Sequence, residues 1–213
     1  MTDSTHCPLC SATTAQLFFC DKRREYLRCS ACALVFVPRE FYLSRDAERA
    51  EYDKHENEIN DKAYRRFLSR LFVPLNNSLV AQAEGLDFGC GPGPALASMF
   101  AEAGHSMSLY DSFYEPDMRV LAKRYDFICA TEVVEHLHKP GWELSRLWKM
   151  LAPGGTLGLM TKLVLGKEAF STWHYKNDPT HVCFFSKQTW HWWAQEANAQ
   201  LSFPASDVIL LVK

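Results

Sequence analysis

The sequence predicts an α/β fold built around a mostly parallel sheet, and three observations support this prediction. From residue 86 onward, apolar segments with strand character alternate with segments of helical character. Such alternation is typical of parallel sheets that helices cover on both faces. A glycine-rich loop follows the first of these strands, as it does in nucleotide-binding α/β units. Two cysteine pairs near the N-terminus mark a separate, smaller unit.

The cysteine pairs, Cys7-x-x-Cys10 and Cys29-x-x-Cys32, are separated by 18 residues. The N-terminus has no signal-peptide pattern and the chain has no run of 18 apolar residues, so we expect a cytoplasmic protein that does not enter the membrane. Thiols stay reduced in the cytoplasm, which favours metal binding over disulfides. Four thiolates around one ion fit a closed, structural zinc site. With a hairpin between the pairs, residues 1–38 are similar to a zinc ribbon.

The other four cysteines are expected to be buried apolar side chains rather than ligands: Cys20, Cys90, Cys129 and Cys183. Residues 39–84 are expected to form a helical linker, because residues 61–71 carry apolar side chains at helical spacing. Pro74 is expected to interrupt this helix.

The core elements follow in order along residues 85–213. We expect strands at 86–89, 106–110, 125–130, 155–161 and 207–212, and helices at 95–103, 142–151 and 187–199. Trp190 and Trp193 have the spacing of a buried helix face, so core packing is favoured for them over substrate binding.

The loop after the first core strand reads Asp87-x-Gly89-x-Gly91-x-Gly93. Glycines let a backbone turn tightly and approach a ligand closely. Asp111 ends the next strand about 20 residues on, where nucleotide-binding units place the carboxylate that binds ribose hydroxyls. Pro94 replaces the third glycine of the dinucleotide fingerprint, and no phosphate-binding Lys-Ser/Thr follows. The acidic loop therefore suits a nucleoside with an amino group and a sulfonium.

This loop resembles motif I of class I S-adenosylmethionine-dependent methyltransferases. Two later segments, residues 125–137 and 151–157, resemble the fourth strand with its turn and the turn before the fifth strand. The resemblance implies a Rossmann-like methyltransferase domain over residues 85–213, ending in an antiparallel strand pair. The implied S-adenosylmethionine ligands are Asp87, Gly89, Gly91, Gly93, Asp111 and Thr131.

The segment between Asp111 and Tyr125 is shorter than in that family, so its third strand is expected to be shortened or missing. Asp117 or backbone groups would then replace the family's adenine contact. The family often has an N-terminal helical lid, and a polar aromatic segment stands at that place: Tyr52, His55, Asn57, Asp61 and Tyr64. A solvated, charged helix is an equal interpretation of this segment.

The segment Glu132-Val-Val-Glu135-His136 places three polar side chains on one face of a helical turn. It resembles the metal motif of ubiquinone-biosynthesis O-methyltransferases and of small-RNA 2′-O-methyltransferases, where a later histidine completes a divalent-ion site. His181 is the candidate for that histidine. Mg²⁺ or a similar ion would lower the pKa of an acceptor hydroxyl. A catalytic role without metal and a structural role remain open alternatives.

A net charge of −2 gives the chain no basic field for nucleic acid. Together with the aromatic-rich distal segment, this charge favours a methyltransferase that acts on a small molecule. A hydroxyl oxygen is the expected acceptor, and methylation at carbon stays an open alternative. One alternative is an RNA methyltransferase whose ribbon contacts phosphates through its cations: Lys22, Arg23, Arg24 and Arg28. A second alternative is a non-catalytic interaction protein on the same fold.

Overall fold

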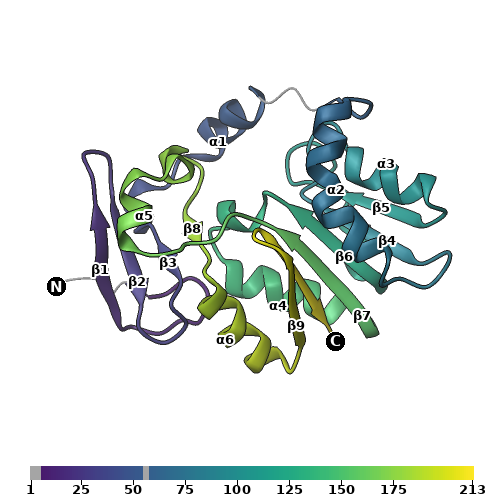
Figure 1. Cartoon of the computed structure of the whole chain (residues 1–213). Coiled ribbons are helices and arrows are strands. Elements are labelled where there is room, and N and C mark those ends of the chain that lie inside the picture. Colours follow the sequence, from purple (N-terminus) through teal and green to yellow (C-terminus); the bar gives the residue numbers. More distant parts are fainter. Residues whose placement is uncertain (1–5, 55–57) are drawn as a thin grey trace.

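The computed structural model describes residues 6–54 and 58–213. Two sheets organise them, one of four strands in the order β1-β2-β3-β8 and one of six strands in the order β5-β4-β6-β7-β10-β9 (Figure 1). The predicted α/β fold with a small cysteine-bearing unit at the N-terminus is confirmed. In the described part of the chain, no helix has the length and apolar character needed to cross a membrane.

The six-stranded sheet is parallel at one side and antiparallel at the other. Its strands are β4 (Glu84–Phe88), β5 (Ser106–Tyr110), β6 (Tyr125–Thr131), β7 (Leu151–Met160), β9 (Gln200–Ala205) and β10 (Val208–Val212). β4 runs parallel to β5 and β6, and β6 runs parallel to β7. β10 is antiparallel to both β7 and β9, as expected for the C-terminal strand pair.

β5 forms one edge of this sheet, where the third strand of the family was predicted to be shortened or missing. The segment between β5 and β6 contains the short 3-10 helix η2 (Met118–Ala122) in place of a strand. Asp117 caps this helix by accepting a hydrogen bond from the backbone N–H of Arg119 at 2.9 Å. The shortened connection therefore leaves the outer edge of β5 without a strand neighbour among the described residues.

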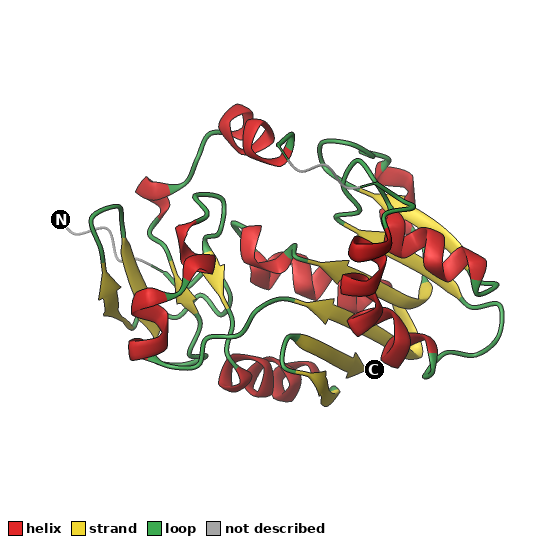
Figure 2. Ribbon diagram, turned by 45° about the horizontal axis from the view of Figure 1, so that its top comes forward, coloured by secondary structure: helices red, strands yellow, loops and turns green. Residues whose placement is uncertain are grey.

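Helices cover both faces of the sheet (Figure 2). α2 (Lys62–Asn76) and α3 (Ala95–Glu102) pack on the face that carries Phe127 and Cys129 of β6. α4 (Pro140–Met150) and α6 (Lys187–Ala197) pack on the opposite face, which carries Ile128 and Ala130. This alternation follows from the two-residue period of a strand and gives the sheet a core on each side.

Three local predictions can be compared directly with the structure. Pro74 lies inside α2 and, contrary to the prediction, does not interrupt it; only two helical residues follow it, so its missing N–H costs one hydrogen bond close to the end of the helix. Cys20 is exposed, so the prediction that it is buried is wrong, whereas the three other non-ligand cysteines are buried. Trp190 is fully buried and stacks on Phe185 with ring centroids 4.6 Å apart, which confirms its core role.

The four-stranded sheet joins the N-terminal unit to the C-terminal half of the chain. β1 (Ala15–Cys20) and β2 (Glu25–Cys29) form the expected hairpin, and β3 (Val35–Phe36) pairs with β2. β8 (Cys183–Phe184) then pairs with β3, and α5 (Lys167–Thr172) packs on β1. The segment up to residue 38 therefore shares its sheet with residues from beyond β7.

The segment between the two sheets is helical over two stretches. After the short η1 (Arg39–Phe41), helix α1 (Arg45–Tyr52) begins where the Ser44 side chain accepts a hydrogen bond from the N–H of Ala47. α2 begins in the same way at Asp61, which accepts from the N–H of Tyr64 at 2.6 Å. His55 and Asn57 of the suggested lid lie outside the described residues.

Candidate active site

A cavity of about 660 Å³ lies at the carboxyl ends of β4, β5 and β6. Open α/β sheets bind their ligands at this end of the strands. Its lining comes from the loops after these strands, from α1 and α2, and from the segment before β8. The lining includes Glu48, Tyr52, Tyr64, Phe67, Gly89, Gly91, Asp111, Phe113, Tyr114, Thr131, Glu132, His136, Lys162, Tyr175, Asp178 and His181.

The glycine loop after β4 has a backbone that favours glycine at two positions. Gly89 has φ +76° and Gly91 has φ +62°, both in the left-handed region. A Cβ at Gly89 would lie 2.5 Å from Cγ2 of Val133, so the loop packs tightly against the turn after β6. A Cβ at Gly91 would meet no atom within 4 Å. Because Gly91 lines the cavity, its open side gives a ligand direct access to the backbone.

Asp111 connects the loops that follow β4 and β5. One carboxylate oxygen accepts hydrogen bonds from the backbone N–H groups of Phe113 at 2.8 Å and Tyr114 at 3.2 Å. The other accepts from the N–H of Gly91 at 3.0 Å. A carboxylate has about four acceptor positions, so the second oxygen can also accept a ligand hydroxyl. The structure thus places Asp111 on the cavity wall and makes it part of the loop's own support.

Asp87 and Gly93 do not line the cavity. The Asp87 side chain is buried beneath the glycine loop, where it contacts the thiol of Cys129. Burial raises the pKa of Asp87 to about 7, against the opposing hydrogen bond from the backbone N–H of Ala97 in α3. Asp87 therefore supports the loop and the start of α3 from behind. Thr131 does line the cavity, at the end of β6.

Three of the four predicted catalytic side chains meet in one cluster. Glu135, His136 and His181 offer ligand atoms that all lie within 4.8 Å of one another, and the two imidazole rings have centroids 4.6 Å apart. Glu135 and His136 belong to the 3-10 helix η3 (Val134–His136), and His181 lies two residues before β8. The Glu135 carboxyl is fully buried, and its Oε2 has no hydrogen-bond partner among the described residues.

The hydrogen bonding of His181 fixes its tautomer. Its Nδ1 lies 2.7 Å from the backbone oxygen of Tyr175, and since a carbonyl only accepts, Nδ1 carries the proton. Nε2 then has a free lone pair and lies 3.8 Å from a carboxylate oxygen of Asp178. Burial lowers the pKa of His181 in spite of the nearby Asp178 carboxylate, which favours the neutral ring. This is the form that binds metal ions or accepts protons.

Glu132 lies beside this cluster and is connected to it through Tyr175. The Tyr175 hydroxyl is 3.1 Å from Oε2 of Glu132 and also contacts Oε1 of Glu135. Glu132 has φ +54°, a strained conformation for a residue with a side chain. Burial and the neighbouring Glu132 carboxylate raise the pKa of Glu135. Tyr175 lies in a segment after β7 that was expected to contact substrate, whereas Asp178 was not expected in the site, and its signal was its place in the same segment as His181.

The four predicted zinc ligands also meet. Sγ of Cys7 is 3.5 Å from Sγ of Cys32, and Cys10 and Cys29 are separated by the same distance. All four sulfur atoms lie within 4.8 Å of one another, and three of these cysteines are buried. A tetrahedral site with Zn–S bonds of about 2.3 Å has sulfur atoms about 3.8 Å apart. The cluster is compatible with a zinc ribbon, and its separations are much longer than a disulfide bond.

Comparison with protein families identifies the domain. A family described as a methyltransferase domain matches residues 52–202, which are most of the chain. This chain belongs to that methyltransferase family. The prediction of an S-adenosylmethionine-dependent methyltransferase domain is therefore confirmed, and with it the enzymatic class.

Among curated proteins, a ubiquinone biosynthesis O-methyltransferase from Nitrobacter winogradskyi is 33% identical over 129 residues. The match covers 58% of this chain and 49% of that protein, so the chain spans about half the length of this methyltransferase relative.

Two solved methyltransferase structures share the fold. The 1,6-didemethyltoxoflavin-N1-methyltransferase of Burkholderia thailandensis has a TM-score of 0.51 at 16% identity, covering 93% of this chain and 98% of its own. The magnesium protoporphyrin IX methyltransferase of Synechocystis has a TM-score of 0.50 at 12% identity, covering 82% and 97%. Both were solved with bound S-adenosylhomocysteine. At these identities the similarity concerns the fold, and it confirms the Rossmann-like class I methyltransferase architecture.

Proposed function

We propose that this protein transfers the methyl group of S-adenosylmethionine to a hydroxyl oxygen of a small, partly planar acceptor. The observation that carries this proposal is the arrangement of two groups of residues on one cavity. The glycine loop and Asp111 line it together with the cluster that contains His136 and His181. One group is suited to a nucleoside and the other to a hydroxyl that must lose its proton.

The nucleoside side of the cavity fits S-adenosylmethionine. Gly91 has an open cradle that a Cβ would partly fill, and the carboxylate of Asp111 has acceptor positions for ribose hydroxyls. When bound, the cofactor supplies a methyl group on a positively charged sulfur. The residues of this chain then bind and orient the two reactants, which is the main requirement of a displacement reaction.

The acceptor side offers a base and a donor set for a divalent ion. His181 Nε2 has a lone pair that can accept the proton of an acceptor hydroxyl. The unpartnered Oε2 of Glu135 and the two imidazoles also form a donor set for Mg²⁺ or another divalent ion. Such an ion lowers the pKa of a hydroxyl that it binds. Aromatic side chains on the walls, among them Tyr52 and Phe113, support a planar acceptor.

We further propose that the cysteine cluster holds a structural zinc ion. Its four thiols form a closed tetrahedral donor set, with no position left for a substrate. The burial of Arg24 removes one of the four ribbon cations that an RNA acceptor could contact. Arg24 donates to backbone carbonyls instead of facing outward.

The experiment is a methyl-transfer assay on the purified chain with labelled S-adenosylmethionine. Catechol and 3,4-dihydroxybenzoate serve as small hydroxyl acceptors and a bulk RNA preparation as the competing acceptor. We expect methyl ethers, identified by mass spectrometry, and a large loss of product with His181→Ala. Methylated RNA, or a product methylated at carbon or nitrogen, would overturn the assignment of the acceptor.

Chelation separates the two metal proposals. We expect metal analysis to find zinc that EDTA does not readily remove, because all four ligands are thiolates in a largely buried site. Added Mg²⁺ or Mn²⁺ should restore activity to EDTA-treated protein, and Glu135→Gln should abolish this response. Activity that does not depend on a divalent ion would leave His181 as a base without metal.

A further inference from the structure

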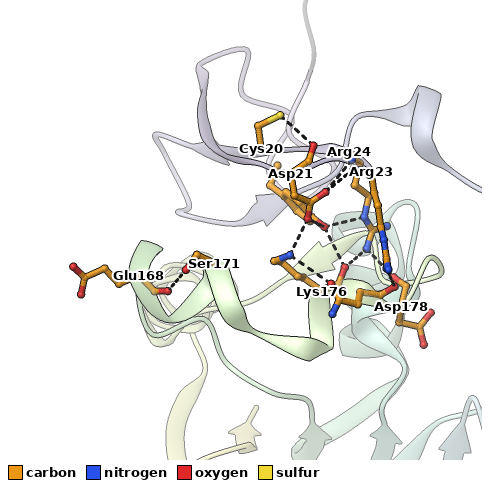
Figure 3. A network of polar contacts seen from close by, with 10 residues as sticks. Cys20, Asp21, Arg23, Arg24, Glu168, Ser171, Lys176 and Asp178 are labelled. Atoms are coloured by element: carbon orange, nitrogen blue, oxygen red, sulfur yellow. Dashed lines mark hydrogen bonds and ion pairs between the residues drawn. The ribbon is translucent and has the colours of Figure 1, made fainter.

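The turn of the ribbon hairpin reaches the segment that carries the acceptor side of the cavity. This turn lies between β1 and β2, and the segment it contacts runs through η4 (His174–Asn177) to β8 (Figure 3). Arg24 is only 6% exposed. Its Nη2 donates to the backbone oxygens of Lys176 at 2.6 Å and Asp178 at 2.7 Å, and its Nη1 donates to that of Pro179 at 3.3 Å.

The Arg24 guanidinium is itself held in place by its neighbours. Its Nε donates to the hydroxyl of Tyr26 at 3.1 Å, and that hydroxyl lies 3.1 Å from the Lys176 oxygen. The buried Lys176 ammonium donates to Asp21 at 2.8 Å. Partial burial opposes the charge of Asp21, but hydrogen bonds from Lys176 and from two backbone N–H groups outweigh it and lower its pKa to about 2. The turn and the segment thus form one charge-compensated network.

The segment held by Arg24 carries three side chains of the cavity: Tyr175, Asp178 and His181. The Tyr175 carbonyl accepts the Nδ1 hydrogen bond that fixes the His181 tautomer. Immediately after His181, the N–H of Val182 donates to the backbone oxygen of Glu135 at 2.9 Å. The oxygen of Val182 accepts from Val37 of the ribbon, also at 2.9 Å. The segment therefore lies between the ribbon on one side and the turn with Glu135 on the other.

We propose that Arg24 is a positioning residue of the active site, which makes the ribbon a part of the acceptor wall. Arg24 holds backbone carbonyls of the stretch between Tyr175 and His181, and through this stretch it fixes the distance between His181 and Glu135. A planar guanidinium can donate in several fixed directions at once, whereas a lysine ammonium cannot reproduce this fork. This inference rests on the proposed function for its catalytic consequence, but the restraint on the segment can be tested without an acceptor.

The test compares Arg24→Gln and Arg24→Lys with a matched control, Arg28→Gln. Arg28 is also a ribbon arginine, but it is exposed and donates to Gln188 of α6, away from the cavity. The first measurement is hydrogen–deuterium exchange of the full chain. We expect faster exchange in residues 174–184 for both Arg24 variants, and wild-type exchange in the glycine loop. Wild-type exchange in residues 174–184 would overturn the proposal, whatever the outcome of the acceptor assay.

The second measurement separates positioning from folding. For the Arg24 variants we expect kcat with catechol to fall by about tenfold or more, because small misplacements of a catalytic group have large effects on rate. The dissociation constant of S-adenosylhomocysteine, measured by calorimetry, should stay at the wild-type value, since the hydrogen bonds of the Arg24 side chain go to the acceptor wall and to Tyr26 of the ribbon. Arg28→Gln should change neither quantity. Parallel loss of kcat, cofactor affinity and thermal midpoint in Arg24→Gln would show a general structural role and overturn the proposal, as would unchanged kcat beside faster exchange.

Discussion

Two glycines of the cofactor loop offer a matched pair for testing the physical account of this loop. Gly89 and Gly91 both have positive φ, at +76° and +62°. They differ in their surroundings, because a Cβ at Gly89 would lie 2.5 Å and 2.9 Å from the two methyl groups of Val133. A Cβ at Gly91 would meet nothing within 4 Å. Alanine therefore tests backbone strain alone at one position and strain plus a steric clash at the other.

The expected free energies follow from these two terms. A left-handed conformation destabilises the folded state by about 1–2 kcal/mol when the residue is alanine. Alanine also reduces the conformational entropy of the unfolded chain, which offsets about 0.4–1 kcal/mol of this destabilisation. Gly91→Ala should therefore lower the free energy of unfolding by about 1 kcal/mol. Overpacking adds typically about 1–3 kcal/mol, so Gly89→Ala should be more destabilising by that amount. Val133→Ala removes both clashing methyl groups and should recover most of this added cost.

Urea unfolding of the cofactor-free protein gives these values for the two alanine variants, for Val133→Ala and for the Gly89→Ala/Val133→Ala double variant. Calorimetry with S-adenosylhomocysteine provides a second readout, in which Gly91→Ala should weaken binding because its Cβ enters the cavity. Equal destabilisation by Gly89→Ala and Gly91→Ala would refute the steric argument. So would a double variant that shows no favourable coupling between the two sites.

Three further predictions concern single side chains. Asp111→Asn removes the negative charge of the carboxylate that we expect to bind the ribose hydroxyls. Because charge-assisted hydrogen bonds are the stronger ones, the substitution should weaken S-adenosylhomocysteine binding by about tenfold in calorimetry. Unchanged affinity would contradict the assignment of Asp111 to the ribose. Cys29→Ser should release the proposed zinc ion, measured by atomic absorption, and should make the first 37 residues sensitive to protease. A variant that keeps its zinc and its resistance to protease would argue against the tetrathiolate site. Burial raises the pKa of Asp87 from 3.8 to about 7. Between these two pH values the folded state binds more protons than the unfolded state, so the free energy of unfolding should fall as the pH rises through about 7. Asp87→Asn should flatten this decline in urea unfolding from pH 4 to pH 8, and an undiminished decline would contradict the buried, protonated carboxyl.

Much of the large sheet could be predicted because its signals are local. The glycine loop, the two-residue period of the strands and the short connection after Asp111 all lie within neighbouring stretches of sequence. β8 (Cys183–Phe184) was missed for the opposite reason: two residues carry no periodic pattern, and its partner β3 is distant in the chain. Cys20 was mispredicted as buried because it lies on β1, the edge strand of its sheet, and the order of strands in a sheet is not encoded by the local sequence.

The same distinction between local and long-range signals applies to the residues of the candidate site. Glu135 and His136 adjoin each other in sequence, so their shared location followed from spacing. Asp87 was expected at the cofactor because it stands in the loop motif, yet its side chain lies beneath the loop. Arg24 has the sequence context of a solvated charge, with acidic neighbours on both sides. Only the tertiary contact with residues 176–179 reveals it as buried, and no local pattern encodes that contact.

The pairing of β3 with β8 has a consequence for the order of events on the ribosome. The four clustered cysteines are made before β8, so the proposed zinc ion can bind before the sheet is complete. The strand that completes their sheet is made about 150 residues later, so closing this pair is a costly long-range step. The N-terminal unit can complete its sheet only after residues 183–184 have been synthesised. The candidate active site, which includes His181 next to β8, is therefore completed only after most of the chain has been synthesised.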